Sequence, residues 1–588
     1  MLEPEISEEW VQSMLMHYVT GGELTMWELH GHETHCMIGY HACPVILDAY
    51  RHHLLNDWSD EQLEKLLEGM VSTSNRSEAH KAYGEQGYLD SQRDNESVSK
   101  TLEYAFDDWC IAQFAKEIAK RGGNLKVKSD SIYTIYIQRS QNWQNIMDEN
   151  GFMRARKNGA FVTPFNPTEV NNHYTEANSW QYSSYVPHDI DGWIEMLGGK
   201  DQAIALLDRL FNEKSKTSGR DQADITGMVG QYAHGNEPSH HAAYLYNYLG
   251  QPEKSNALVH RIMKEHYSSK PDGLCGNEDC GQMSAWYVLS AMGFYPVCPG
   301  SGEYSTICPT FRKIVMHLAE GDVTIERSHW PTGKIWREGK FYEKSNIELS
   351  ETERITPAPY FNDWQQRFDG RRTIELKNRF LGSEIHYILN GEEHLYEGPF
   401  TVEGDAEISA IATHPKRKPS ARVTQLLTQF VADKKVRYLT EPEPQYYENG
   451  AEGLVDRLRG TENYRIGGWQ GWNKDMVVEI DLLKERSIKR VGVECLENMR
   501  SWIFFPKSIV VEASLDGKEY HLVGMTKNNN YPATRERQEE SITHTFTVQK
   551  TTTARYLRIR AENYGALPAW HISAGEQSWL FVDEIEIE

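Results

Sequence analysis

Two loops of this chain have the composition of a hydrolytic acid–base pair. In HYTEANSWQYSSYVPHD (173–189), Glu176 lies among aromatic residues, and burial beside such side chains keeps a carboxyl group protonated, as a general acid requires. In PDGLCGNEDCGQ (271–282), Glu278 and Asp279 lie between glycines. Because adjacent side chains diverge, one of these two can face a cleft while the other caps or orients. An acid and a base from these loops would form a two-carboxylate site, whereas a capping or salt-bridged Glu176 is the structural alternative.

A third motif, HGNEPSHH (234–241), combines oxygen ligands with histidines directly before an apolar run. Asn236 and Glu237 offer hard oxygen ligands, which a cation such as Ca²⁺ prefers to imidazole. Ser239 and His240 can instead cap the helix that the apolar run predicts. Both roles can hold at once.

A fourth motif, WELHGHETHCMIGYH (27–41), contains His30, His32, His35 and His41. Four histidines suggest zinc, but His32 and His35 have H-x-x-H spacing with the glutamate inside. The H-E-x-x-H pattern, in contrast, places two ligands on one helical face. The spacing therefore disfavours a zinc site.

Composition excludes some classes of ligand. The chain has 588 residues, a formal charge of −23 at pH 7, 16 tryptophans and 31 tyrosines. The acidic balance argues against nucleic acid as a partner, because proteins that bind it present a basic face. Aromatic rings beside polar side chains suit sugars, although they also fill ordinary cores.

The cysteines and apolar runs point to no special class. Cys275 and Cys280 have C-x4-C spacing, which is not a zinc spacing, so we expect mostly buried thiols among the eight cysteines. No apolar run approaches the length of a membrane helix. The acidic start, MLEPEISEEW, has no secretory signal pattern.

The motifs lie in a helical region that gives way to β-structure near residue 300. Residues 10–18 and 102–114 carry apolar stripes at helical spacing, and we count roughly eleven such segments before residue 300. Long polar loops, 163–189 and 215–241, hold the motifs, and loops of that length are usually functional. Later runs such as KIVMHL and AEISAIATH predict short strands.

These patterns predict a multidomain chain of two to four domains. A change in composition near 417–445 marks a linker. We expect a helical domain at 1–300, a β-rich extension of it at 301–355, a small β module at 356–418 and a β-sandwich at 440–588.

Residues 26 to about 310 resemble glycoside hydrolase family 92, a family of exo-acting α-mannosidases. The resemblance is carried by WELHGHETHCMIGYHACPVI, EANSWQYSSYVPHD, GQYAHGNEPSHHAAYLYNYLGQP and GNEDCGQMSAWYVLSAMGFYPVCPG. It implies an (α/α)6 barrel, hydrolysis with inversion of configuration, and a Ca²⁺ ion that grips two mannose hydroxyls. The expected substrates are mannose-containing glycans with α-1,2 or related linkages.

The resemblance also implies roles for individual residues. Glu176 is similar in position to the general acid and Asp279 to the base, while Asn277 and Glu278 would flank and orient that base. Asn236 and Glu237 resemble the calcium region. The implied substrate-binding residues in this region are Trp27, Glu28, His30, Trp180, Gln181 and His240, with Trp180 as an apolar wall.

One departure from the family pattern lies at the N-terminus. Family members carry a β-sandwich before the barrel and an L-W-D-T type segment in its first helices, and this sequence contains neither. We therefore expect a barrel that is incomplete at its N-terminus, a chain that is a fragment, and a missing N-terminal segment as a partner. The resemblance implies a periplasmic or extracellular location. The alternatives are a catalytically impaired carbohydrate-binding protein, or a mannosyl-phosphate hydrolase, which would not need the acid Glu176.

The remaining segments resemble accessory modules. Residues 375–415 resemble the small chitobiase-C-terminal or fibronectin-like module of bacterial glycosidases. Residues 440–588 resemble discoidin-type domains (factor 5/8 type C, carbohydrate-binding module family 32) through GGWQGW, RYLRIRAENYGALPAWH and SWLFVDEIEIE. We expect Trp469, Trp472 and Trp570 to be sugar platforms, whereas Trp579 and Phe581 alternate as core residues do.

Overall fold

A computed structural model describes residues 4–318, 321–347, 349–430, 433–447, 449–529 and 540–588. The chain forms two compact units. The first comprises residues 1–364, 374–400 and 407–426, and the second comprises 365–373, 401–406 and 427–588. Among the described residues, no helix has the length and apolar character needed to cross a membrane.

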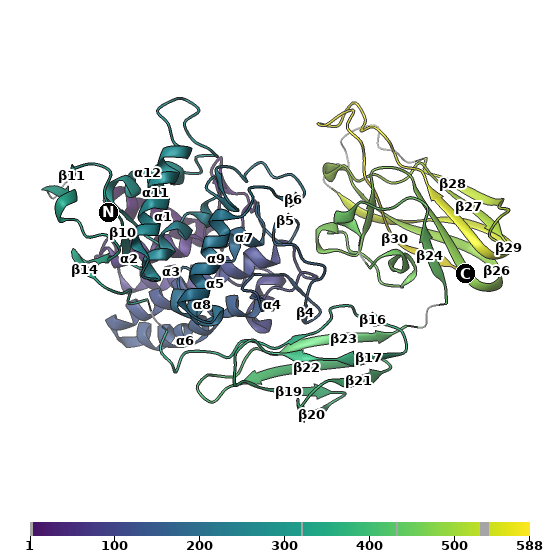
Figure 1. Cartoon of the computed structure of the whole chain (residues 1–588), viewed down its shortest axis with the longest axis horizontal. Coiled ribbons are helices and arrows are strands. Elements are labelled where there is room, and N and C mark those ends of the chain that lie inside the picture. The colour runs from purple at the N-terminus through teal and green to yellow at the C-terminus, as the bar shows by residue number, and fades with distance from the viewer. Residues whose placement is uncertain (1–3, 319–320, 348, 431–432, 448, 530–539) are drawn as a thin grey trace. The chain divides into compact units, whose positions relative to one another are not determined.

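The first unit is mainly helical (Figure 1). Its described α-helices are α1 (Pro4–Gly21), α2 (Ala42–Arg51), α3 (Asp60–Thr73), α4 (Glu78–Gln86), α5 (Ser97–Ile118), α6 (Gly123–Arg139), α7 (Ser179–Tyr182), α8 (Ile190–Leu197), α9 (Lys200–Asn212), α10 (Leu245–Tyr248), α11 (Pro252–His266) and α12 (Gln282–Met292).

Helix α5 lies at the centre of this unit. It is buried on nearly all its faces and packs against α2, α3 and α6, whose apolar sides complete the core. The amphipathic helix α3 begins at a capping box, in which Ser59 and Gln62 each bond the other's backbone N–H. Because α5 is enclosed, its acidic residues Glu103, Asp107 and Asp108 are buried and need partners.

Short strand pairs fasten the long loops between the helices. Strand β5 (Glu169–Val170) pairs with β6 (Ser218–Gly219), and β7 (Met228–Val229) pairs with β8 (Tyr232–Ala233). The first pair joins the two long polar loops to each other. Loops that hold the candidate residues are therefore tied to the scaffold.

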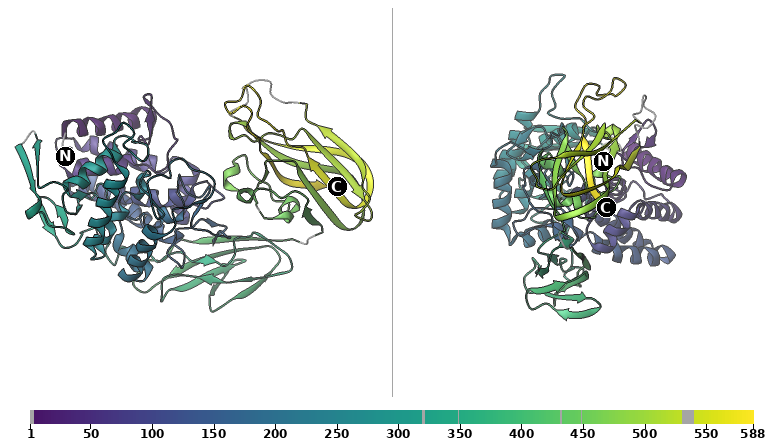
Figure 2. Two further views of the ribbon diagram at one scale, coloured as in Figure 1. Left: turned by 45° about the horizontal axis from the view of Figure 1, so that its top comes forward. Right: turned by 90° about the vertical axis from the view of Figure 1, so that its right-hand side faces the viewer.

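Strands follow the last helix of the first unit. A four-stranded sheet has the order β14-β13-β10-β9, and a hairpin of β11 and β12 extends from the edge of the unit (Figures 1 and 2). The strands of this region are β9 (Phe294–Tyr295), β10 (Tyr304–Thr306), β11 (Lys313–Leu318), β12 (Gly321–Glu326), β13 (Ile335–Arg337) and β14 (Lys340–Tyr342).

The small β module contains a five-stranded sheet in the order β16-β23-β22-β19-β20. Strand β22 buries alternate residues, as expected of a sheet with one covered face. The strands of the module are β15 (Tyr360–Phe361), β16 (Arg367–Phe368), β17 (Arg371–Ile374), β18 (Leu376–Lys377), β19 (Glu384–Leu389), β20 (Glu392–Leu395), β21 (Phe400–Glu403), β22 (Ala406–Thr413) and β23 (Val423–Gln429).

The second unit contains a seven-stranded antiparallel sheet that encloses a hydrophobic core. The order is β25-β30-β26-β29-β27-β28, with β24 paired to β26. Register shifts along β26 allow this long strand to bend. The strands of this sheet are β24 (Lys435–Tyr438), β25 (Gln470–Trp472), β26 (Met476–Asn498), β27 (Ser508–Ser514), β28 (His521–Lys527), β29 (Ser541–Ala561) and β30 (Leu580–Ile587). The predicted order of a helical domain followed by β modules is confirmed.

Two of the predicted sugar platforms are core residues. Trp472 is fully buried in the main core and Trp469 is 2% exposed beside Phe581. Their indole N–H groups donate to the carbonyls of Thr440 and Thr461. The prediction that Trp469 and Trp472 present a face to sugars is therefore wrong, since both rings are enclosed. Trp570 is only partly buried, where it contacts Phe504 and His571.

Candidate active site

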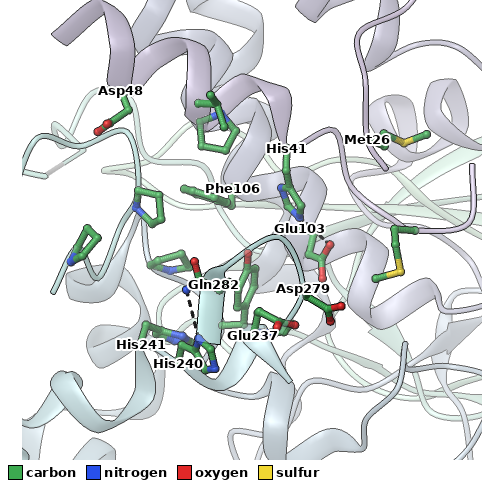
Figure 3. Close-up of a pocket in the computed structure, with 18 of the residues that line it drawn as sticks. Met26, His41, Asp48, Glu103, Phe106, Glu237, His240, His241, Asp279 and Gln282 are labelled. Atoms are coloured by element: carbon green, nitrogen blue, oxygen red, sulfur yellow. Dashed lines mark hydrogen bonds and ion pairs between the residues drawn. The ribbon is translucent and has the colours of Figure 1, made fainter. Parts of the chain in front are cut away.

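Loops and helices of the first unit line an open cavity of about 710 Å³ (Figure 3). Carboxylates, amides and aromatic rings share its wall, which is the composition expected of a site for a polar ligand such as a sugar. The residues that line it include Trp27, His41, Glu103, Glu176, Asp224, Asn236, Glu237, His240, Asn277, Asp279, Gln282 and Tyr295.

Glu176 reaches this cavity from the turn before α7. Its φ of 50° is unusual for a residue with a side chain, and such strain persists where neighbouring structure enforces it. Burial, followed by the negative charges of Asp224 and Asp279, raises the pKa of Glu176 to about 7. A proton is therefore available on this carboxyl group near neutral pH.

Asp279 lines the cavity from the loop before α12. Its φ is 45°. Burial and the charges of Asp224 and Glu278 raise the pKa of Asp279. The adjacent Glu278 instead accepts hydrogen bonds from the backbone N–H and the hydroxyl of Ser284, at 2.9 and 2.8 Å. Glu278 lies in the loop before α12 and outside the cavity lining, so Asp279 faces the cavity and Glu278 supports the loop.

Sequence reasoning missed Asp224. This carboxylate lines the cavity and accepts hydrogen bonds from Gln222 at 2.6 Å and from Asn277 at 3.2 Å. It thereby connects loop 215–230 to the loop that bears Asp279. The available signal was an acidic residue in a long polar loop just before HGNEPSHH.

Asn236 and Glu237 offer oxygen atoms to the same cavity. The side-chain N–H of Asn236 donates to the backbone carbonyl of Glu176 at 3.0 Å, which leaves its carbonyl oxygen for other partners. Oε1 of Glu237 is buried without a hydrogen-bond partner in the described part of the chain. Burial, then the charges of Asp279 and Glu176, raises the pKa of Glu237 to about 7.

These oxygens fit a hard cation in part. A buried carboxylate oxygen without a donor is stabilised by a metal ion, and amide and carboxylate oxygens are the ligands that Ca²⁺ takes. Within the described ranges, no group of three or more His, Cys, Asp or Glu residues has an arrangement that holds a metal. A cation here would need ligand hydroxyls or water to complete its shell.

The histidines of HGNEPSHH act as a neutral framework. Nε2 of His240 donates to the carbonyl of His234 at 2.9 Å, and Nε2 of His241 donates to the carbonyl of Ser184 at 2.7 Å. Burial lowers the pKa of both rings to about 4 and that of His234 to about 2. These rings hold the loop that presents Asn236 and Glu237.

The histidine-rich segment 27–41 contributes Trp27 and His41 to the cavity lining, but not Glu28 or His30, which are exposed. Four backbone N–H groups between Met26 and His35 donate to the carboxylate of Glu33 and order the loop. The substrate-binding roles predicted for Glu28 and His30 receive no support from their positions.

Trp180 and Gln181 also lie outside the cavity lining. The ring of Trp180 is 3% exposed and packs against Phe152 and Arg209. Gln181 closes a capping box with Asn178 and donates to the carbonyl of Gln231. The predicted Trp180 wall is therefore wrong, because the cap turns this helix into the core.

A charged triad of His41, Glu103 and Asp107 lies at another wall of the cavity, which His41 and Glu103 line. The two ring nitrogens of His41 lie 2.8 Å from Oδ1 of Asp107 and 2.9 Å from Oε2 of Glu103. Tyr182 donates to the other oxygen of Glu103, and the Tyr40 N–H donates to the other oxygen of Asp107. Although burial opposes it, the two carboxylates raise the pKa of His41 well above 6.5, so the ring is an imidazolium.

Comparison with known proteins identifies the family. Residues 1–353 match the family model described as the glycosyl hydrolase family 92 catalytic domain. The chain belongs to glycosyl hydrolase family 92. Residues 439–580 of this family 92 chain match the F5/8 type C domain. The predicted family and the predicted discoidin-type domain are both confirmed.

Two relatives, one of them with two solved structures, show the extent of the similarity. The GH92 alpha-mannosidase BT3965 from Bacteroides thetaiotaomicron, in complex with mannoimidazole, is 29% identical with a TM-score of 0.51, over 73% of this chain and 48% of that chain. A second structure of BT3965 is 30% identical with a TM-score of 0.50, over 73% of this chain and 47% of that chain. An uncharacterized secreted glycosidase from Arthroderma benhamiae is 27% identical over 268 residues, 41% of this chain and 31% of that protein. This family 92 chain thus spans less than half the length of either relative.

Proposed function

We propose that this family 92 chain is the catalytic part of an inverting, calcium-dependent exo-α-mannosidase that acts on mannose-containing glycans with α-1,2 or related linkages. The observation that carries the proposal is that two loops bring the carboxyl groups of Glu176 and Asp279 to the lining of one cavity. Burial raises the pKa of Glu176 to about 7, so this group holds a proton near neutral pH. A glycosidase needs such a pair, one protonated and one ionised.

In the proposed reaction, Glu176 gives its proton to the glycosidic oxygen as the bond to the anomeric carbon breaks. Asp279 takes a proton from a water molecule on the opposite face of the sugar ring, and the oxygen of that water bonds to the anomeric carbon. The product has inverted configuration. Asn277 and Asp224 hold the loop of Asp279, because their side chains bond each other across two loops.

The proposal assigns Ca²⁺ to Asn236 and Glu237. When bound, this ion would supply positive charge for binding two mannose hydroxyls and orienting the ring. The buried unpartnered Oε1 of Glu237 supports the assignment. Because Asn236 contacts Glu176 through its amide N–H, its carbonyl oxygen can serve a cation while the residue positions the acid.

For the second unit we propose weak binding of a terminal sugar. The match of residues 439–580 to the F5/8 type C domain supports this, and Trp570 is the remaining candidate platform. The proposed location is outside the cytoplasm, supported by the secreted glycosidase among its relatives.

The acid role is tested with the Glu176→Gln variant on two substrates. An α-1,2-mannobiose has a leaving group that needs a proton, whereas a 2,4-dinitrophenyl α-mannoside does not. We expect the variant to lose turnover of the disaccharide by about a thousandfold and to retain much of the aryl mannoside activity. Glu213→Gln, which removes an exposed carboxylate at the end of α9 outside the cavity lining, is the control. Equal losses on both substrates would remove Glu176 from the acid role.

A further inference from the structure

One wall of the cavity consists of three side chains from separate elements. His240 follows the turn Glu237–Ser239, Gln282 begins α12 and Tyr295 ends β9. All three line the cavity. Figure 3 shows Gln282 reaching toward His240, with a hydrogen bond between them.

A backbone carbonyl determines which atoms donate and which accept in this wall. Nε2 of His240 lies 2.9 Å from the carbonyl oxygen of His234, and a carbonyl only accepts, so Nε2 carries the proton. The ring is buried, and its Nδ1 faces the amide nitrogen of Gln282, which only donates, so Nδ1 accepts. Nδ1 lies 3.2 Å from Nε2 of Gln282.

His240 and Tyr295 together fix the orientation of the Gln282 amide. Only the NH₂ end can donate to Nδ1, because the carbonyl end would place two acceptors face to face. The second N–H of the same group donates to the Tyr295 hydroxyl oxygen at 3.0 Å. Both amide hydrogens are thereby used within the protein.

Two groups in the wall are left for a ligand. Within the described part of the chain, no residue donates to Oε1 of Gln282. Since the Tyr295 oxygen accepts from Gln282, its own hydrogen is free to donate elsewhere. Tyr295 is 6% exposed and stacks on Tyr244 at 5.1 Å, so the hydroxyl has a fixed position.

We infer that Gln282 Oε1 and the Tyr295 O–H together bind one hydroxyl group of the glycoside, and so determine specificity. The ligand hydroxyl donates to Gln282 and accepts from Tyr295. A hydroxyl group satisfies both partners, whereas a hydrogen atom satisfies neither and an ether oxygen cannot donate. His240 is a positioning residue that acts through Gln282. This inference rests on the proposed glycoside substrate and adds the residues that select it.

The experiment crosses protein variants with deoxy substrates. Gln282→Met keeps the length of the side chain without the amide, and Tyr295→Phe removes only the hydroxyl. The full chain and both variants are assayed with 4-nitrophenyl α-mannoside and its 2-, 3-, 4- and 6-deoxy analogues. Tyr287→Phe is the control, because Tyr287 lies on α12 outside the cavity lining.

We expect each cavity variant to lower kcat/KM for the parent mannoside on the order of 10- to 100-fold, the effect of leaving a buried polar group unpaired. For one deoxy analogue, and only one, kcat/KM of the variants should lie within about threefold of that of the unaltered chain. That analogue already lacks the hydroxyl group that Gln282 and Tyr295 bind, so their removal costs nothing further. If the loss of kcat/KM from the variant and the loss from deoxygenation multiply for all four analogues, the inference is overturned. A merely structural role of these side chains predicts that result.

A binding measurement separates this inference from the proposed function. If the chain hydrolyses no mannoside, the function fails, and the same comparison is made by calorimetry with methyl α-mannoside and its deoxy analogues. Non-additive binding at one hydroxyl would uphold the inference without the activity. Additive losses, or no binding of any mannoside, would overturn it.

Discussion

Asn236 donates its side-chain N–H to the backbone carbonyl of Glu176 across 3.0 Å. The bond joins HGNEPSHH to the loop of the proposed acid. It also points the amide so that its carbonyl oxygen is left for a cation. One residue therefore links the proposed metal site to the acid.

The Asn236→Asp variant should separate these two roles. It keeps an oxygen ligand but loses the N–H donor, so we expect Ca²⁺ affinity, measured by calorimetry, to be no weaker. We expect kcat on a mannobiose to fall at least about tenfold, since a misplaced acid loses orientation. Asn236→Leu is the companion variant, and it should lose both Ca²⁺ affinity and activity. A loss of Ca²⁺ affinity without any change in kcat for Asn236→Asp would contradict this division of roles.

Activity should fall on both sides of a pH optimum. Glu176 acts only when protonated, and its pKa of about 7 predicts a decline above about pH 7. Asp279 acts only when ionised, and its raised pKa moves the acid limb above the range of an ordinary aspartate. A pH profile of kcat/KM on a mannobiose measures both limbs.

Removing the charge of Asp224 should shift the alkaline limb. Because this charge raises the pKa of Glu176, Asp224→Asn should move the limb to lower pH while the amide can still accept from Asn277. Asp221→Asn, an exposed residue of the same loop, is the control. An alkaline limb that stays in place in Asp224→Asn would show that Asp224 does not tune the acid.

The His41 triad should stabilise the fold in a pH-dependent way. The folded pKa of His41 lies above 6.5, so its stabilising effect is complete below about pH 6.5 and is lost as pH rises through the folded value. His41→Gln leaves Glu103 and Asp107 with a neutral partner. Breaking a buried ion pair costs about 3–5 kcal/mol, and we expect about 2 kcal/mol because the His41 side chain is 39% exposed. Thermal unfolding should show the largest difference near pH 6 and a smaller one at alkaline pH; a constant difference would argue against an imidazolium.

The tryptophans of the second unit should divide into two classes. Trp472→Ala opens a cavity in the core and should lower the free energy of unfolding by about 3–5 kcal/mol. Trp570→Ala should lower the free energy of unfolding by less, because the ring is only partly buried, and weaken binding of a terminal sugar by about tenfold. Differential scanning calorimetry and a glycan panel measure the two effects. Unchanged sugar binding in Trp570→Ala would leave this domain without its proposed platform.

Sequence patterns located the loops of the site better than the direction of each side chain. Long polar loops contain Glu176, Asn236 and Asp279, and acidic or amide residues in such loops are seldom needed for the fold. All three residues line the cavity. Trp180 and Gln181 come from the same motif as Glu176, but both are buried in the short helix that begins after the cap residue Asn178. No local pattern distinguishes these two outcomes.

Residues brought in by tertiary packing were not predictable. Glu103 lies on the buried helix α5 and reaches the cavity only because His41 and Tyr182 bind it. Gln282 is one polar residue at a helix start, and its role depends on His240, 42 residues earlier. Trp469 and Trp472 follow glycines that suggested an exposed turn, yet packing of the sandwich encloses both rings.

The stereochemistry of the product tests the central claim most directly. The full chain is incubated with an α-1,2-mannobiose and Ca²⁺, and the anomeric signals of released mannose are followed by proton NMR from the first minutes. A water-activating base at Asp279 and an acid at Glu176 predict that β-mannose appears first and that α-mannose grows in only by mutarotation. Initial release of α-mannose, or no release of mannose at all, would contradict this account.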